Sequence, residues 1–186
     1  PSQSLIAMDA PPAQEDCRPF VRVASLMSAA GLHVPRVIAQ DLERGFLLLS
    51  DLGTASYLQA LNAATADDLF ADAIDALLRW QLASRPGVLP PYDRALLTRE
   101  LGLFQEWYVR RHRGLELDGA QQKVLAAMFE LILDNNLAQP AVYVHRDYMP
   151  RNLMVCEPNP GILDFQDAVY GPITYDVASL FKDAFL

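Results

Sequence analysis

The chain has 186 residues, which suffices for one globular domain or for a small lobe attached to a larger one, but not for two full-sized domains. Its composition is 52% hydrophobic and 20% charged, which excludes disordered and collagen-like proteins. The formal net charge is -8 and the only lysines are Lys123 and Lys182, so no nucleic-acid partner is expected. A small phosphorylated ligand is not excluded, because one metal ion can replace several lysines.

The cysteines and apolar runs bear on the compartment. Cys17 and Cys156 lie far apart without metal-ligand spacing, so neither a disulfide framework nor a zinc site is expected. The predicted localisation is therefore the cytoplasm. No apolar run approaches the ~20 residues that cross a bilayer, so no membrane partner is expected. The chain opens at Pro1 without Met and stops within an apolar pattern, which predicts that both ends were cut from a longer protein.

The first fifty residues predict a strand, a helix and two strands. Ser4 to Asp9 is strand-like and is closed by two prolines. Apolar residues recur at helical steps over 15–30, and Gly31 supplies a C-terminal stop. Segments 34–39 and 45–49 predict two strands. These elements are too few for an independent core.

A change to helical patterning after position 52 marks a lobe boundary. The expected units are therefore 1–52, a partial small lobe with a short hinge, and 53–186, a large lobe that is incomplete at its C-terminus. Thr65 with Asp68 resembles a capping box that begins a helix. Amphipathic helices follow at 98–113 and 118–137.

From Ala141 the pattern predicts strands at 141–144, 153–155 and 161–163, the last two forming a tight antiparallel hairpin. If 153 pairs with 163, then Asn152 faces Asp164, with Cβ atoms ~5 Å apart. Two hard oxygen ligands in this arrangement suit Mg²⁺, which fills its coordination sphere with water and phosphate oxygens. The alternative is that both residues only terminate strands.

The loop before Asn152 carries a second carboxylate, Asp147. Near a bound metal it can accept or orient a hydroxyl proton, which suggests phosphoryl transfer. His145 follows an apolar strand, so a buried histidine that braces the loop is expected. Arg146 is expected to pair with a carboxylate, for which Asp176 is a candidate.

Two motifs carry a family resemblance. HRDYMPRN (145–152) followed by ILDF (162–165) resembles the catalytic loop and metal-binding strand of protein-kinase-like phosphotransferases. The PRN ending and GPITYDVASL (171–180) are more similar to the aminoglycoside and choline phosphotransferase branch. The resemblance implies an α+β, two-lobed protein-kinase-like fold, here with a partial small-lobe sheet and helix and a mostly helical large lobe, truncated at both ends.

Further segments, LIAMDAPP (5–12), EDCRPF (15–20), GFLLLSDLG (45–53) and WYVRRH (107–112), resemble the anomeric N-acetylmuramate/N-acetylglucosamine kinases of bacterial cell-wall recycling. That resemblance implies ATP and Mg²⁺ as cofactors and phosphorylation of an amino sugar at its anomeric hydroxyl, as an aminoglycoside phosphotransferase family enzyme of peptidoglycan recycling. By the motif match, Asp147 is the catalytic base, Asn152 and Asp164 bind the metal and nucleotide phosphates, Asp176 supports the loop, and the nucleotide base lies on the backbone of Leu49, Ser50, Asp51 and Leu52.

Some features depart from the family pattern. The strand before the first helix carries Met8 where such proteins usually have a lysine, so the role of Glu15 on the helix is open. The acceptor pocket is assigned to four residues of the large lobe, with core packing as the alternative for the tryptophan: Glu106, Trp107, Arg110 and Arg111. An aminoglycoside-type antibiotic kinase and a non-catalytic pseudokinase are the alternative functions. The oligomeric state is open.

Overall fold

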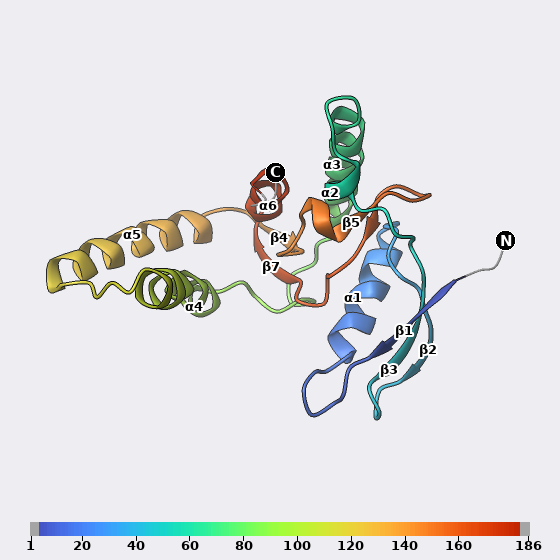
Figure 1. Ribbon diagram of the computed structural model, residues 1–186, viewed down its shortest axis with the longest axis horizontal. Coiled ribbons are helices and arrows are strands. Elements are labelled where there is room, and N and C mark those ends of the chain that lie inside the picture. Colours follow the sequence, from blue (N-terminus) through green and yellow to red (C-terminus); the bar gives the residue numbers. More distant parts are fainter. Residues whose placement is uncertain (1–3, 183–186) are drawn as a thin grey trace.

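Figure 1 shows the computed structural model, which describes residues 4–182. A three-stranded antiparallel sheet has the order β1-β3-β2, made of β1 (Leu5–Asp9), β2 (Val37–Asp41) and β3 (Phe46–Ser50). Helix α1 (Arg18–Ala29) packs on this sheet. The predicted strand, helix, strand, strand order is therefore present.

The bounds of these elements follow local chemistry. Pro19 lies in the first turn of α1, where a missing N–H costs no helical bond. Gly31 ends the helix with φ +76°, a left-handed conformation that glycine adopts readily. Strand β2 begins at Val37, later than the predicted start at 34, because Pro35 cannot donate to a ladder.

Helices form the next part of the chain. They are α2 (Tyr57–Ala60), α3 (Ala66–Leu82), α4 (Arg94–Leu103), the π-helix η1 (Phe104–His112) and α5 (Gly119–Leu137). The predicted capping box at Thr65 is wrong. Its hydroxyl donates to the Ala60 carbonyl at 2.7 Å, and capping boxes occur instead at Ser56 and Asp118.

The C-terminal part supplies short strands and one helix. Strand β4 (Ala141–Val144) pairs with β7 (Val169–Pro172), and β5 (Leu153–Met154) pairs with β6 (Gly161–Ile162). The turn η2 (Pro150–Asn152) precedes β5, and α6 (Tyr175–Phe181) follows β7. The sequence reading missed β7, because this short strand ends in Gly171-Pro172, residues typical of turns.

The hairpin forms with a register one residue away from the predicted one. Leu153 pairs with Ile162 and Met154 with Gly161, whereas the prediction paired 153 with 163. The side chains of a shifted strand exchange faces. The predicted facing of Asn152 and Asp164 by register alone is therefore wrong.

One hydrophobic core joins elements from α1 to α6. Met27 of α1, Trp80 of α3, Phe165 after β6 and Leu180 of α6 belong to the same buried cluster, all at 1% exposure or less. A second cluster, which includes Leu133, links α4 and α5 to β4 and β7. In Figure 1, α4 and α5 project to one side of this body.

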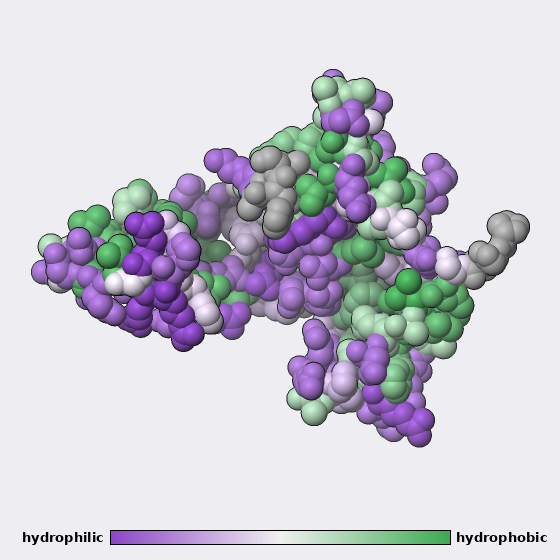
Figure 2. Space-filling model, in the orientation of Figure 1, coloured by the Kyte–Doolittle hydropathy of each residue, from purple (hydrophilic) through white to green (hydrophobic). Residues whose placement is uncertain are grey.

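Apolar side chains also remain on the surface. Figure 2 shows hydrophobic surface over the β1–β3–β2 sheet beside the N-terminal end. Ile6, Ile38 and Phe46 are exposed there, and α5 exposes Val124 and Leu131. No helix within residues 4–182 combines the length and apolar character that crossing a membrane requires.

Candidate active site

The loop after β4 is braced by a buried histidine. His145 is 0% exposed; its Nε2–H donates to the Leu163 carbonyl at 3.0 Å, and its Nδ1 accepts from the Asp147 N–H at 3.3 Å. Burial lowers the pKa of His145 to about 4, so the ring is neutral at physiological pH. A neutral ring both donates and accepts, which suits these two partners.

Asp176 at the start of α6 holds the same loop from the other side. Its carboxylate accepts from the N–H of His145 at 2.7 Å and from that of Arg146 at 3.0 Å. Burial raises the pKa of Asp176 to about 7, although the two N–H donors act in the opposite direction. The backbone at Arg146 has φ +79°, a strained conformation for a residue with a Cβ. Asp176 therefore stabilises a bend that would otherwise cost free energy.

The Arg146 guanidinium has different partners from the expected one. It pairs with Glu100 of α4 and, at 3.8 Å, with Asp167, while within residues 4–182 Asp176 binds only the backbone N–H groups of His145 and Arg146. The expected ion pair with Asp176 is therefore wrong. Tyr92 also donates to Glu100. This network ties α4 to the loop 145–152.

Asn152 and Asp164 meet in spite of the shifted register. The Asn152 Nδ2 donates to the Asp164 carboxylate at 3.2 Å and to the Asp147 carbonyl at 2.9 Å. Asp164 has φ +61°, so the chain turns back directly after β6 and redirects its side chain toward the loop. Convergence thus comes from a left-handed residue and not from facing strand positions.

These groups suit a hard divalent cation. The Asn152 Oδ1 has no hydrogen-bond partner within residues 4–182, and the other carboxylate oxygen of Asp164 accepts from Gln166 Nε2 at 2.8 Å. That part of the chain contains no group of three or more His, Cys, Asp or Glu side chains that could hold a metal by themselves. One amide and one carboxylate oxygen fit Mg²⁺, which is usually completed by water and phosphate oxygens.

Asp147 lies at the centre of this arrangement. Burial and then the charge of Asp164 raise the pKa of its carboxyl, whereas Arg146 lowers it. A raised pKa brings a carboxylate closer to the range in which it can accept a proton from a substrate. Loop and neighbouring strand therefore bring together one candidate base and two candidate metal ligands.

The predicted hinge residues lie at the end of β3. Leu49 and Leu52 are buried, and the Ser50 hydroxyl accepts from the Arg36 N–H at 2.9 Å. The Gly53 N–H donates to Asp51, which lowers the pKa of that carboxyl. Further along, the Val155 N–H donates to the Ala55 carbonyl at 2.8 Å, so the chain that follows the hinge is fastened to the β5–β6 hairpin.

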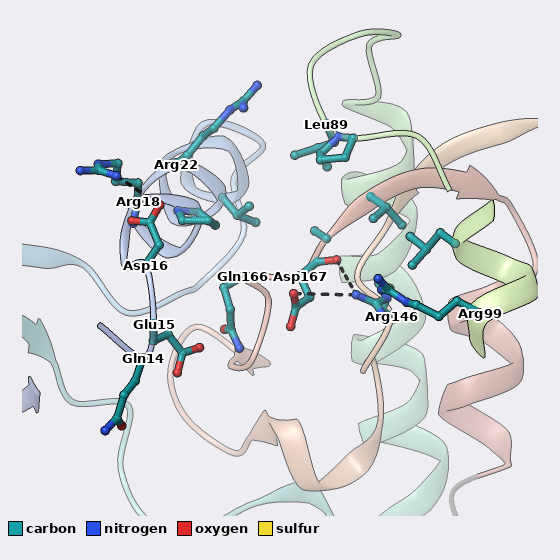
Figure 3. Close-up of a pocket in the computed structure, with 16 residues that line it drawn as sticks. Gln14, Glu15, Asp16, Arg18, Arg22, Leu89, Arg99, Arg146, Gln166 and Asp167 are labelled. Atoms are coloured by element: carbon teal, nitrogen blue, oxygen red, sulfur yellow. Dashed lines mark hydrogen bonds and ion pairs between the residues drawn. The ribbon is translucent and has the colours of Figure 1, made fainter. Parts of the chain in front are cut away.

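The four residues predicted to bind the acceptor lie on η1. Arg110 and Arg111 both pair with Glu106, at 2.7 Å and 3.0 Å, and the Arg111 guanidinium lies 4.3 Å from the centre of the Trp107 ring. Trp107 is 56% exposed, so the alternative of core packing is wrong. The four residues pair with one another and do not line the cavity of about 620 Å³ that Figure 3 shows.

Sequence reasoning missed several groups around this site. Gln166 and Asp167 directly follow ILDF, so their nearness to Asp164 was available as a signal. Glu100 lies 46 residues before Arg146, and no local pattern connects the two. Long-range ion pairs of this kind depend on how helices pack.

Comparisons with known proteins also point to a phosphotransferase. The sequence model of the phosphotransferase enzyme family, APH, matches residues 1–185. Proteins named N-acetylmuramate/N-acetylglucosamine kinase from Pseudomonas aeruginosa and Pseudomonas putida are 59% and 61% identical over 99% and 98% of the chain. The aligned region is 54% of each of these relatives, so the chain spans about half of their length.

Two solved structures show the fold. Aminoglycoside phosphotransferase APH(3'')-Id from Streptomyces rimosus, in complex with ADP and streptomycin, matches with a TM-score of 0.71 and 17% identity, over 96% of this chain and 70% of that one. The gentamicin complex of APH(2'')-IIa matches with a TM-score of 0.67 and 16% identity, over 97% and 64% of the two chains. The expected α+β, protein-kinase-like fold is thereby confirmed.

Proposed function

We propose that this chain, which belongs to the phosphotransferase enzyme family, carries the catalytic centre of a cytoplasmic ATP-dependent kinase that phosphorylates the anomeric hydroxyl of N-acetylmuramate or N-acetylglucosamine in peptidoglycan recycling. The observation that carries the proposal is the convergence of Asp147, Asn152 and Asp164, joined by Asn152 hydrogen bonds of 2.9 Å and 3.2 Å. The choice of acceptor is supported by the names of relatives that are 59% and 61% identical to this chain.

In the proposed reaction, the anomeric oxygen of the sugar forms a bond to the γ-phosphorus of ATP as the bond to the ADP oxygen breaks. Asp147 accepts or orients the proton of the attacking hydroxyl, helped by its raised pKa. His145 and Asp176 keep the loop in position. Mg²⁺ held by Asn152 and Asp164 would neutralise the phosphate charge.

The nucleotide is proposed to lie between the hinge and the hairpin. Leu49, Leu52 and Met154 are buried apolar side chains whose chemistry suits the faces of a purine ring. Met8 of β1 lines a neighbouring cavity of about 340 Å³ together with Glu15 and Gln166. Because Met8 has no charge, the metal is proposed to replace the missing lysine in anchoring the phosphates.

The test measures ATP-dependent ADP release by the complete protein with N-acetylmuramate, N-acetylglucosamine or an aminoglycoside as acceptor. Asp147→Asn should lower kcat by about 10²- to 10⁴-fold, the usual contribution of a general base, with ATP binding retained. The control is Asp75→Asn, because Asp75 is an exposed carboxylate on α3. This variant should leave turnover unchanged.

The remaining outcomes decide among the alternatives. Turnover of the aminoglycoside alone would replace the proposed acceptor by an antibiotic. ATP binding without ADP release for any acceptor would favour a pseudokinase. Unchanged turnover in Asp147→Asn would remove the proposed base.

A further inference from the structure

A cavity lies between α1, α4 and the segment after β6. It has a volume of about 620 Å³ and is lined by residues such as Glu15, which precedes α1 and lies outside the helix that the sequence predicted to contain it, Arg99 of α4 and Asp167. Figure 3 shows these three side chains around it. Ligand pockets commonly have volumes of about 300 to 1,000 Å³, so a monosaccharide can be accommodated.

The cavity borders the proposed site of phosphoryl transfer. Gln166 lines it and donates to the Asp164 carboxylate at 2.8 Å. Arg146 and Asp167 also line it, and both are close enough to Asp147 to shift the pKa of its carboxyl. Asp147 does not itself line the cavity, but its chain neighbour Arg146 does, so a sugar bound there lies beside the loop that carries Asp147.

Four arginines line the cavity, and three of them already have partners. Arg18 pairs with Asp16 at 3.4 Å, Arg22 donates to the Val88 carbonyl, and Arg146 pairs with Glu100. In Figure 3, Arg18 and Arg22 extend away from Gln166 and Asp167.

Arg99 differs from these three arginines. It makes no hydrogen bond or ion pair within residues 4–182, and Figure 3 shows it extending from α4 toward Arg146. A guanidinium keeps its charge at any physiological pH. Arg99 is thus an uncompensated positive charge on the cavity wall that α4 supplies.

Helix α4 holds Arg99 in place relative to the catalytic loop. The residue next to it, Glu100, pairs with Arg146. At the start of the helix, the Asp93 side chain accepts from the Leu96 N–H at 2.9 Å, and Arg94 pairs with Glu130 of α5 at 2.7 Å. A charge on an anchored helix loses less entropy when it binds a ligand.

We infer that Arg99 binds the carboxylate of an acidic acceptor sugar and so sets the preference for N-acetylmuramate over N-acetylglucosamine. The inference rests on the proposed function. The two sugars differ by a lactyl ether, which gives N-acetylmuramate a carboxylate, and the guanidinium fork matches a carboxylate with two parallel hydrogen bonds. Arg110 and Arg111 are the rival assignment, but both guanidiniums pair with Glu106 outside the cavity.

The experiment compares kcat/KM for the two sugars in the complete protein and in Arg99→Gln. In this variant kcat/KM for N-acetylmuramate should fall about 10- to 100-fold, mainly through a higher KM. A decrease of this size is the usual contribution of hydrogen bonds to a charged group. Its kcat/KM for N-acetylglucosamine should stay at the wild-type value, which also shows that the variant is folded. For Arg99→Lys, kcat/KM for N-acetylmuramate should lie between the values of the wild type and of Arg99→Gln, because lysine keeps the charge but lacks the forked pair of donors.

The matched control is Arg113→Gln, because Arg113 is an exposed arginine after η1. This variant should leave kcat/KM unchanged for both sugars. Equal losses for both sugars in Arg99→Gln would overturn the inference, as would a loss of N-acetylmuramate preference only in Arg110→Gln or Arg111→Gln. Wild-type turnover of N-acetylglucosamine alone would also overturn it. Turnover of neither sugar by the wild type would instead reject the proposed function.

Discussion

Two buried ionisable side chains hold the loop 145–152, and burial shifts their pKa values in opposite directions. Burial favours the neutral form of each, which lowers the pKa of His145 to about 4 and raises that of Asp176 to about 7. In an unfolded chain the corresponding values are about 6.5 and 3.9. Both groups therefore titrate differently in the folded and unfolded states across the same acidic range.

The signs of the two contributions to stability are opposite. As pH falls from about 6.5 to 4, the unfolded chain binds a proton at position 145 that folded His145 does not, so this residue lowers the free energy of unfolding. Over nearly the same range the folded state binds the proton at Asp176 more tightly, so acidification raises the free energy of unfolding.

We predict that single variants separate these contributions. In Asp176→Asn, the free energy of unfolding should fall more steeply on acidification than in the wild type, because only the histidine contribution remains. In His145→Gln it should fall less steeply, or rise. Urea unfolding at several pH values between 4 and 7, monitored by circular dichroism, measures both slopes. Profiles parallel to the wild type in both variants would contradict the assignment.

At the scale of elements, local patterns predicted strands and helices well where apolar periodicity was strong. Helix α5 was expected over 118–137 and is found over Gly119–Leu137. Positions that depend on geometry beyond the local pattern were not predictable. The observed hairpin register differs from the predicted one by one residue. The φ of +61° that redirects the Asp164 side chain is not indicated by the residues around Asp164. The carboxylate and amide therefore meet, as predicted, through a geometry that the sequence did not indicate.

Helix capping illustrates the same limit and yields a prediction. The Asp118 side chain accepts from the N–H groups of Ala120 and Gln121 at 2.8 Å and 2.9 Å. Removing such a cap in Asp118→Ala should lower the free energy of unfolding by about 1 kcal/mol, as measured by urea unfolding. Asp118→Asn, which retains a capping oxygen, is the matched control and should recover most of the loss. An alanine variant as stable as the wild type would show that the cap does not contribute.

For the molecule as a whole, the sequence suggested two lobes with a boundary near position 52. That boundary is still a prediction. Buried contacts cross it, because Phe20 of α1 packs against Phe165 with ring centres 4.8 Å apart. The acceptor cavity also could not be predicted, since its walls come from α1, α4 and the segment after β6. These segments are distant in sequence, and tertiary packing brings them together: α1 belongs to the first buried cluster and α4 to the second.

The shared core predicts that α1 and α3 unfold together. Met27 of α1 is 0% exposed and belongs to the same cluster as Trp80 of α3. Met27→Ala removes buried contacts and leaves a cavity, at a cost of about 2 to 5 kcal/mol. In native-state hydrogen exchange of the complete protein, peptides from both helices should lose protection by the same free energy.

The surface control is Leu82→Ala, because Leu82 is 84% exposed at the end of α3, and its exchange should match the wild type. Loss of protection confined to α1 in Met27→Ala would mean that this helix opens independently of the helical body. The walls of the acceptor cavity would then separate without global unfolding. Equal losses in both helices would instead mean that α1, which forms one wall of the cavity, stays in place until the first buried cluster unfolds.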